Sequence, residues 1–122
     1  MISVVVADDH AVVREGLSAL VSSEADLNVV AAVDSGEAAV AAVVEHDPDV
    51  VLMDLAMPGI GGVEATARIM ASRDTAIVVL TTFADASRVL AALDAGAVGY
   101  LLKDSPGTEL IAGVRSAAAG GS

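Results

Sequence analysis

Short runs of β-branched and aliphatic residues alternate along the chain with longer, alanine-rich segments whose apolar residues recur every three or four positions. The short runs predict buried strands, and the three-to-four spacing predicts helices with one apolar face. The predicted strands are 2–7, 28–33, 50–53, 76–80 and 99–102. The predicted helices are 11–21, 34–46, 61 to about 72, 85–95 and a last one from 105 onward. Five strand–helix units in regular alternation predict one α/β domain with a parallel sheet flanked by helices.

Local signals define both ends of the second predicted helix. Asp34 is predicted to be its N-cap, and Glu37, three residues further on, is the predicted partner in a capping box. The helix is expected to end near the solvated His46, because Asp47 precedes Pro48 and a residue before proline disfavours the helical backbone.

Glycine and proline mark the ends of two further helices. Gly96 is predicted to close the fourth helix in a left-handed conformation. Ser105 and Pro106 are predicted to be the N-cap and the first-turn proline of the last helix. In the first helix, five apolar residues are expected to share the inner face: Val12, Val13, Leu17, Leu20 and Val21.

The composition narrows the class of protein. Hydrophobic residues make up 55% of the chain, which indicates a folded domain, yet the apolar runs fall well short of the roughly 18 residues of a membrane span. A net charge of −11 disfavours duplex DNA as a direct partner, and solubility alone would also explain this charge. With no cysteine and no recognisable signal peptide, we expect a cytoplasmic protein that binds neither nucleic acid nor membrane.

Charged and polar residues stand where the predicted strands end. Asp8 and Asp9 follow the first strand and Asp54 follows the third, while Thr81 and Lys103 follow the fourth and fifth. Ligands of an open parallel sheet bind beyond the carboxyl ends of its strands. If the first and third strands are neighbours, three carboxylates converge, and their mutual repulsion favours a bound divalent cation.

These residue types suit a Mg²⁺-dependent phosphoryl transfer. Mg²⁺ prefers oxygen ligands and needs only one or two carboxylates beside a phosphate. Lys103 and Thr81 would bind the phosphate, and an aspartate nucleophile would form an acyl phosphate. Taken singly, each residue has an ordinary explanation: Asp8 and Asp9 as helix caps, Asp54 as a turn residue, Thr81 as a strand residue and Lys103 as a solvated strand end. These explanations do not predict that all five stand at strand ends.

Four segments resemble the receiver domains of two-component response regulators. They are VADDH at 6–10, MDLAMPG at 53–59, LT at 80–81 and GYLLK at 99–103, and the resemblance covers nearly the whole chain. It implies a flavodoxin-like fold: a doubly wound, five-stranded parallel sheet of order 2-1-3-4-5 with helices on both faces. It also implies a signalling domain rather than an enzyme, one that takes a phosphoryl group from a sensor histidine kinase.

The resemblance assigns roles to the strand-end residues. Asp54 is the implied phosphoacceptor, and Lys103 is the implied contact of the phosphate. The implied Mg²⁺ ligands are Asp9 directly, Asp8 through water, the Asp54 carboxylate and the backbone carbonyl of Ala56.

The resemblance also implies how phosphorylation of the site would change a more distant surface. Thr81 would move towards the phosphoryl group and Tyr100 would then turn inward, although an ordinary half-buried tyrosine fits the sequence equally well. The fourth helix, fifth strand and fifth helix would change their affinity for an output domain or for a second copy. Ala91, Ala92 and Ala95 would let such a partner approach closely, but alanine is also the best helix former, and that ordinary explanation of the three residues stands.

Three short motifs most resemble the NarL/FixJ (LuxR-type) branch of transcriptional regulators: DDH at 8–10, REGL at 14–17 and KD at 103–104. We therefore expect residues 1–119 to be a receiver domain and 120–122 to be the start of a linker or an expression remnant. A C-terminal helix-turn-helix output domain is expected in the full-length protein, with homodimerisation upon phosphorylation. His10 is interpreted as a helix-start residue rather than a phosphate carrier.

The chain departs from common family patterns at two places near the site. Ala56 and Phe83 are apolar where the family tunes access of the hydrolytic water, so slow loss of the phosphoryl group is expected. Asp104 follows Lys103 where other branches often have proline, so a trans bond is expected.

Three other functions compete with this interpretation. A phosphatase with an aspartate nucleophile usually has a second aspartate two residues later, where this chain has Ala56. A flavin- or nucleotide-binding module would need a phosphate-binding loop after the first strand, where Asp8 and Asp9 would repel phosphate. A pseudo-receiver would have the fold without accepting phosphate.

Overall fold

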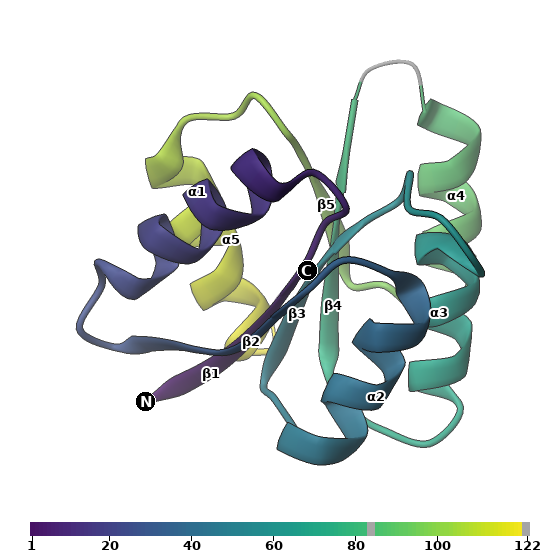
Figure 1. Cartoon of the computed structure of the whole chain (residues 1–122), viewed down its shortest axis with the longest axis horizontal. Coiled ribbons are helices and arrows are strands. Elements are labelled where there is room, and N and C mark those ends of the chain that lie inside the picture. Colours follow the sequence, from purple (N-terminus) through teal and green to yellow (C-terminus); the bar gives the residue numbers. More distant parts are fainter. Residues whose placement is uncertain (83–84, 121–122) are drawn as a thin grey trace.

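The computed structural model describes residues 1–82 and 85–120, within which strands and helices alternate strictly (Figure 1). In chain order the elements are β1 Ile2–Ala7, α1 Ala11–Ser22, β2 Leu27–Val33, α2 Gly36–His46, β3 Val50–Asp54, α3 Gly61–Met70, β4 Ala76–Thr81, α4 Ala86–Asp94, β5 Gly99–Leu102 and α5 Gly107–Ala118. Every predicted element is present, and the ends differ from the predicted ones by at most two residues.

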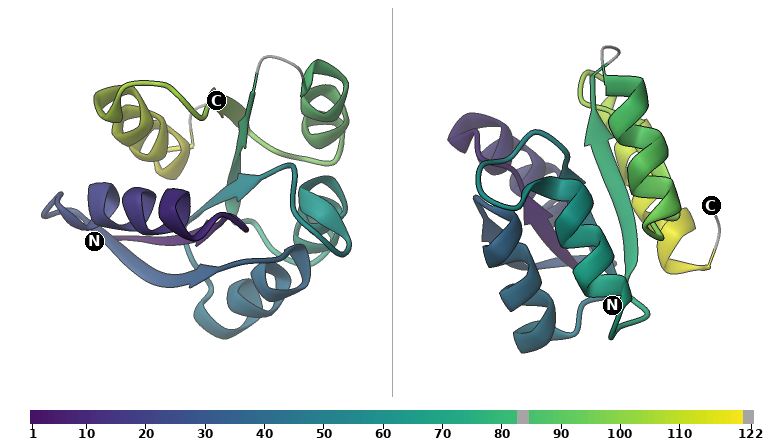
Figure 2. Two further views of the ribbon diagram at one scale, coloured as in Figure 1. Left: turned by 45° about the horizontal axis from the view of Figure 1, so that its top comes forward. Right: turned by 90° about the vertical axis from the view of Figure 1, so that its right-hand side faces the viewer.

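The five strands form one parallel sheet in the order β2-β1-β3-β4-β5, as predicted. Helices α1 and α5 cover one face of the sheet, and α2, α3 and α4 cover the other (Figures 1 and 2). β5 is an edge strand of four residues that pairs only with β4. Because all strands run the same way, their carboxyl ends lie along one edge of the sheet.

β3 lies in the middle of the sheet and is buried along its whole length. Successive side chains point to opposite faces, so Val51 and Met53 pack beneath α2, α3 and α4, whereas Val50 and Leu52 pack beneath α1 and α5. Burying one such side chain stabilises the fold by about 1.5–3 kcal/mol. The unbroken apolar run that predicted this strand therefore reflects two covered faces.

The inner face predicted for α1 is only partly correct. Leu17 and Val21 are buried, and Leu20 packs against the same core cluster. Val12 and Val13 are exposed. At about 100° per residue, Val12 lies on the opposite side of the helix from Val21, whereas Val13 shares the buried face but lies in the first turn of α1.

The capping prediction for α2 is wrong by one residue. The N-cap is Ser35, whose hydroxyl accepts a hydrogen bond from the Ala38 amide at 3.1 Å, and Asp34 lies outside the helix. Glu37 does not complete a capping box, because its carboxylate accepts a hydrogen bond from the Ile60 amide instead. The predicted end near His46 is confirmed, with Asp47 in the left-handed region at φ 46°.

The start of α5 also lies later than predicted. Pro106 is the N-cap and Gly107 the first helical residue, because the extended Pro106 offers its carbonyl to the Glu109 and Leu110 amides. Ser105 is therefore not the cap. Gly96 has the predicted positive φ, at 116°. Among the described residues, no helix is both long enough and apolar enough to cross a membrane.

Candidate functional site

The strand-end residues gather at one edge of the sheet. Asp8 and Asp9 follow β1, Asp54 is the last residue of β3, Thr81 is the last residue of β4, and Lys103 follows β5. β1, β3, β4 and β5 are consecutive in the sheet, so neighbouring strands bring these side chains together. Asp8, Asp54 and Thr81 are buried.

Lys103 lies between the two buried carboxylates. Its Nζ is 3.0 Å from Oδ1 of Asp54 and 3.5 Å from Oδ2 of Asp8. Burial lowers the pKa of Lys103, but the hydrogen bond and negative charge of Asp54, with those of Asp8, outweigh it and raise the pKa above its ordinary value. Lys103 is therefore a cation at neutral pH, able to bind a phosphate oxygen.

Backbone groups orient the Asp54 carboxylate. Oδ1 accepts a hydrogen bond from the Ala56 amide at 3.2 Å as well as contacting Lys103. Oδ2 is buried and has no hydrogen-bond partner among residues 1–82 and 85–120. Burial is the main cause that raises the pKa of Asp54, opposed by Lys103 and the Ala56 amide and assisted by the charge of Asp8. One oxygen of Asp54 is thus held, and the other is free to react or to bind.

Asp8 is fixed in the same manner. Its Oδ1 accepts a hydrogen bond from the His10 amide at 2.9 Å, and its buried Oδ2 accepts none from the described part of the chain. Arg14 donates a hydrogen bond at 2.9 Å to the Asp8 backbone carbonyl, a contact that the sequence did not reveal. Asp9 is more exposed and lies at the mouth of the site.

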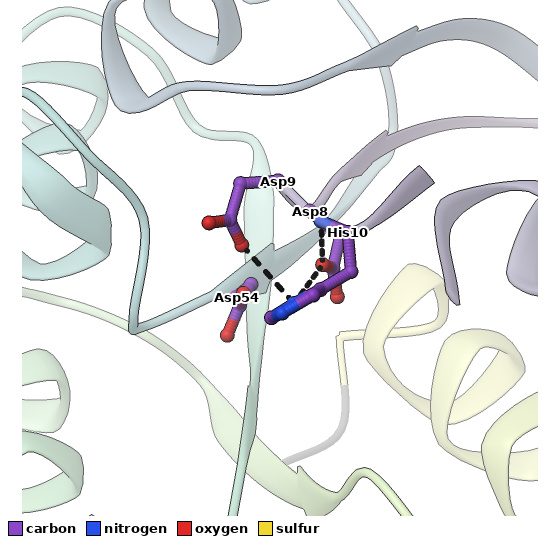
Figure 3. A group of neighbouring side chains, drawn as sticks. All are labelled: Asp8, Asp9, His10 and Asp54. Atoms are coloured by element: carbon purple, nitrogen blue, oxygen red, sulfur yellow. Dashed lines mark hydrogen bonds and ion pairs between the residues drawn. The ribbon is translucent and has the colours of Figure 1, made fainter. Parts of the chain in front are cut away.

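The acidic cluster has the chemistry of a hard-cation site. Asp8, Asp9, His10 and Asp54 each offer a ligand atom within 4.8 Å of the others (Figure 3). Among the described residues, the buried Oδ2 atoms of Asp8 and Asp54 accept no hydrogen bond. Burying such oxygens is costly unless cations offset their charge, and the single ammonium of Lys103 is shared between the two carboxylates. Oxygen ligands match Mg²⁺, so these residues fit the ion that the sequence predicted. His10 is the N-cap of α1, as expected of a helix-start residue.

Thr81 and Tyr100 lie on either side of an apolar groove. Thr81 is 2% exposed and its hydroxyl donates to the Thr82 carbonyl at 3.2 Å. Tyr100 is 54% exposed, so its ring faces outward. The groove has a volume of 380 Å³ and runs between α4 and β5, with Leu90 and Leu93 along it.

Several details near the site complete the comparison with the sequence predictions. Ala92 was expected on the outer face of α4 but is fully buried in the core, because it lies with Val89 on the face of α4 that packs against the sheet. The Lys103–Asp104 bond is trans, since the described residues contain no cis peptide. Phe83 lies outside the described residues.

The sequence did not reveal the importance of Gly62. A Cβ at this position would lie 2.4 Å from the Asp54 carbonyl oxygen.

This fold and site define the receiver-domain class. Residues 4–115 match the model of the response regulator receiver domain, and the chain belongs to that family.

Named relatives place it in the NarL/LuxR-type branch. The chain is 42% identical over 98% of its length to the transcriptional regulatory protein LiaR of Bacillus subtilis, and 46% identical over 93% to the oxygen regulatory protein NreC of Staphylococcus epidermidis. It covers 57% and 53% of those proteins, about half the length of each. The receiver domain of the putative response regulator NarL from Mycobacterium tuberculosis superposes with a TM-score of 0.93 at 38% identity, with 98% of this chain and 97% of that one covered.

Proposed function

We propose that this domain accepts a phosphoryl group on Asp54 from a phosphohistidine of a sensor histidine kinase. The observation that carries the proposal is the state of the Asp54 carboxylate: Oδ1 is held by Lys103 and the Ala56 amide, while Oδ2 is buried and accepts no hydrogen bond from any residue that the structure describes. A held carboxylate with one free oxygen is oriented for attack on phosphorus.

The reacting groups are this chain's own side chains. Oδ2 of Asp54 attacks phosphorus, the P–N bond to the histidine breaks, and its electron pair stays on the ring nitrogen, leaving a neutral imidazole when the other nitrogen carries a proton. Lys103 binds a phosphoryl oxygen, and the Thr81 hydroxyl turns from the Thr82 carbonyl to donate to another.

Mg²⁺ is the proposed cofactor. Asp8, Asp9, Asp54 and the backbone carbonyl of Ala56 would hold it, and it would offset the negative charge of the carboxylates and of the phosphoryl oxygens. The buried Oδ2 atoms of Asp8 and Asp54, which accept no hydrogen bond from the described residues, support this assignment.

The proposed output is a change in the α4–β5–α5 face. Movement of Thr81 would leave space into which the exposed Tyr100 ring turns, in the groove that both residues line. The altered face would then favour a homodimer or an output domain, as a shift between two existing states. Tyr100→Ala should abolish phosphorylation-dependent dimerisation in analytical ultracentrifugation while Asp54 is still phosphorylated; dimerisation that persists in this variant would contradict the route.

The remainder of the full-length protein is part of the same proposal. The relatives are transcriptional regulators about twice as long as this chain, so we propose that a C-terminal helix-turn-helix domain binds DNA and that the receiver itself does not. The cytoplasm is the proposed location. The domain would act as a signalling module, and multiple-turnover hydrolysis of an external phosphate ester would contradict that.

The central test is the intact mass after incubation with acetyl phosphate. A single phosphoryl adduct is expected with Mg²⁺, and none is expected with EDTA or in Asp54→Asn. Asp34→Asn removes an exposed carboxylate outside the site and should behave as wild type. A folded wild-type domain without an adduct would favour the pseudo-receiver.

A further inference from the structure

The start of α2 contacts the turn that follows Asp54. A Cβ added to Gly36 would lie 2.7 Å from the Gly61 carbonyl oxygen and 2.8 Å from Cγ1 of Ile60. Both distances are shorter than real Cβ contacts, so the first turn of α2 and the start of α3 approach as closely as they do because residue 36 has no side chain. The turn at 55–60, which joins β3 to α3, is therefore held against α2.

Glu37 bonds this turn from the neighbouring helix. Its Oε1 accepts a hydrogen bond from the Ile60 amide at 3.2 Å. Ile60 is the N-cap of α3, and no side chain of the usual capping kind serves that helix start. A carboxylate at the positive end of the α3 dipole is favourable. Glu37 therefore caps the start of α3, although the sequence predicted that it would cap the start of α2.

The same carboxylate rests on Gly59. A Cβ at residue 59 would lie 2.4 and 2.5 Å from the two carboxylate oxygens of Glu37, and Gly59 has a φ of 75°, which favours glycine. Glu37 thus packs on the backbone of one residue of the turn and bonds the next.

The opposite end of the turn belongs to the phosphoacceptor site. The Leu55 amide donates to the Leu80 carbonyl at 3.3 Å, and the Ala56 amide donates to Oδ1 of Asp54 at 3.2 Å. Leu55 and Met57 are buried. The turn is therefore anchored at Asp54 by β4 and the core, and at Ile60 by Glu37.

We propose that Glu37 is a positioning residue for the phosphorylation of Asp54: it holds the turn at 55–60 so that the Ala56 amide and carbonyl keep their places beside the Asp54 carboxylate. This inference rests on the proposed function. Without the Glu37 carboxylate the far end of the turn loses its bond from α2, and the Ala56 backbone samples positions from which it no longer orients Asp54.

The test compares Glu37→Ala, Glu37→Gln and Glu64→Ala. Glu64 is the matched control, because it is an exposed acidic residue in the first turn of α3 that bonds Arg68 in its own helix. The rate of adduct formation with acetyl phosphate and saturating Mg²⁺ should fall about 3–10-fold in Glu37→Ala, the range expected for one lost orienting hydrogen bond. Glu37→Gln keeps an acceptor oxygen and should stay within about twofold of wild type.

Two further measurements separate positioning from a general effect on the fold. The midpoint of thermal unfolding should be nearly the same for Glu37→Ala and Glu64→Ala, whereas the Ala56 amide resonance should shift only when Glu37 is replaced by alanine. A wild-type rate in Glu37→Ala, or equal losses in Glu37→Ala and Glu64→Ala, would overturn the proposal. If the wild-type domain accepts no phosphoryl group, the proposed function fails separately, and an unchanged Ala56 resonance in Glu37→Ala would then overturn the role of Glu37.

Discussion

The Lys103 ammonium lies 3.0 Å from Oδ1 of Asp54, whereas the buried Oδ2 of that carboxylate accepts no hydrogen bond from the residues that the structure describes. The same ammonium lies 3.5 Å from Asp8. A single cation thus offsets two buried carboxylates, which makes it important for stability as well as for chemistry.

Replacing Lys103 by methionine should destabilise the domain by about 1–3 kcal/mol at pH 7 without Mg²⁺, because two buried carboxylates lose their cation. Urea unfolding in EDTA measures the loss. Added Mg²⁺ should recover part of it, since an ion that binds only the folded state stabilises that state. Equal stability of the variant and wild type in EDTA would contradict this account.

The ionisation of Asp54 should oppose folding when no cation is bound. Burial raises its folded-state pKa above the ordinary 3.8, so the folded protein binds the proton more tightly than the unfolded chain does. Stability from this group is therefore present below pH 3.8 and is lost as pH rises through the folded-state pKa. In EDTA, the stability advantage of Asp54→Asn over wild type should grow with pH through this window and then level off. Urea unfolding between pH 3.5 and 7 tests the trend.

Arg115 should give the opposite pH dependence. Its guanidinium bonds both carboxylate oxygens of Asp26 at 2.9 Å and Glu24 at 2.7 Å, joining α5 to the turn between α1 and β2. The hydrogen bond from Arg115 lowers the pKa of Asp26 below 3.8, so the stabilisation is present above pH 3.8 and is lost as pH falls through the lowered value. Arg115→Ala should thus be less stable than wild type at pH 7 and equally stable in strong acid. A stability difference that persists unchanged in acid would exclude the ion pair as its source.

Two glycine-to-alanine changes should have opposite signs. Gly62→Ala would press a Cβ against the Asp54 carbonyl and should destabilise the fold by about 1–3 kcal/mol, with slower phosphorylation because the phosphoacceptor backbone must shift. Gly16 lies in α1 with nothing within 4 Å of its added Cβ, so Gly16→Ala should stabilise by about 0.5–1 kcal/mol through helix propensity. Thermal unfolding of both variants distinguishes local fit from a general effect of alanine.

The strands and the candidate site were predictable from sequence because both depend on the order of residues within short segments of the chain. Five unbroken apolar runs identify the strands, and the residue that ends each run must stand at the same sheet edge when all strands are parallel. Asp8, Asp54 and Lys103 could therefore be brought together without coordinates. The strand order itself came from the family resemblance, since alternation alone does not decide which strands are neighbours.

The errors arose where a side chain's environment depends on a distant segment. Val13, four residues before Leu17, has the helical spacing of a core residue, yet it is exposed in the first turn of α1. Ala92 was assigned to the outer face, although alanine suits a close contact with the sheet as well as an exposed surface. Glu37 has the spacing of a capping-box residue, and its partner, Ile60, lies 23 residues further along the chain.

Because β5 lies at the edge of the sheet, the segment that carries Lys103 should be locally less stable than the central strands that position Asp8 and Asp54. Amide hydrogens in the central strands β1, β3 and β4, which position Asp8, Asp54 and Thr81, should exchange with solvent more slowly than those of β5, because an edge strand of four residues opens at lower cost. Fraying of β5 would carry Lys103 away and leave the carboxylates in place. The cation that neutralises the site therefore directly follows an edge strand, and local opening of that strand would break its ion pairs with Asp54 and Asp8.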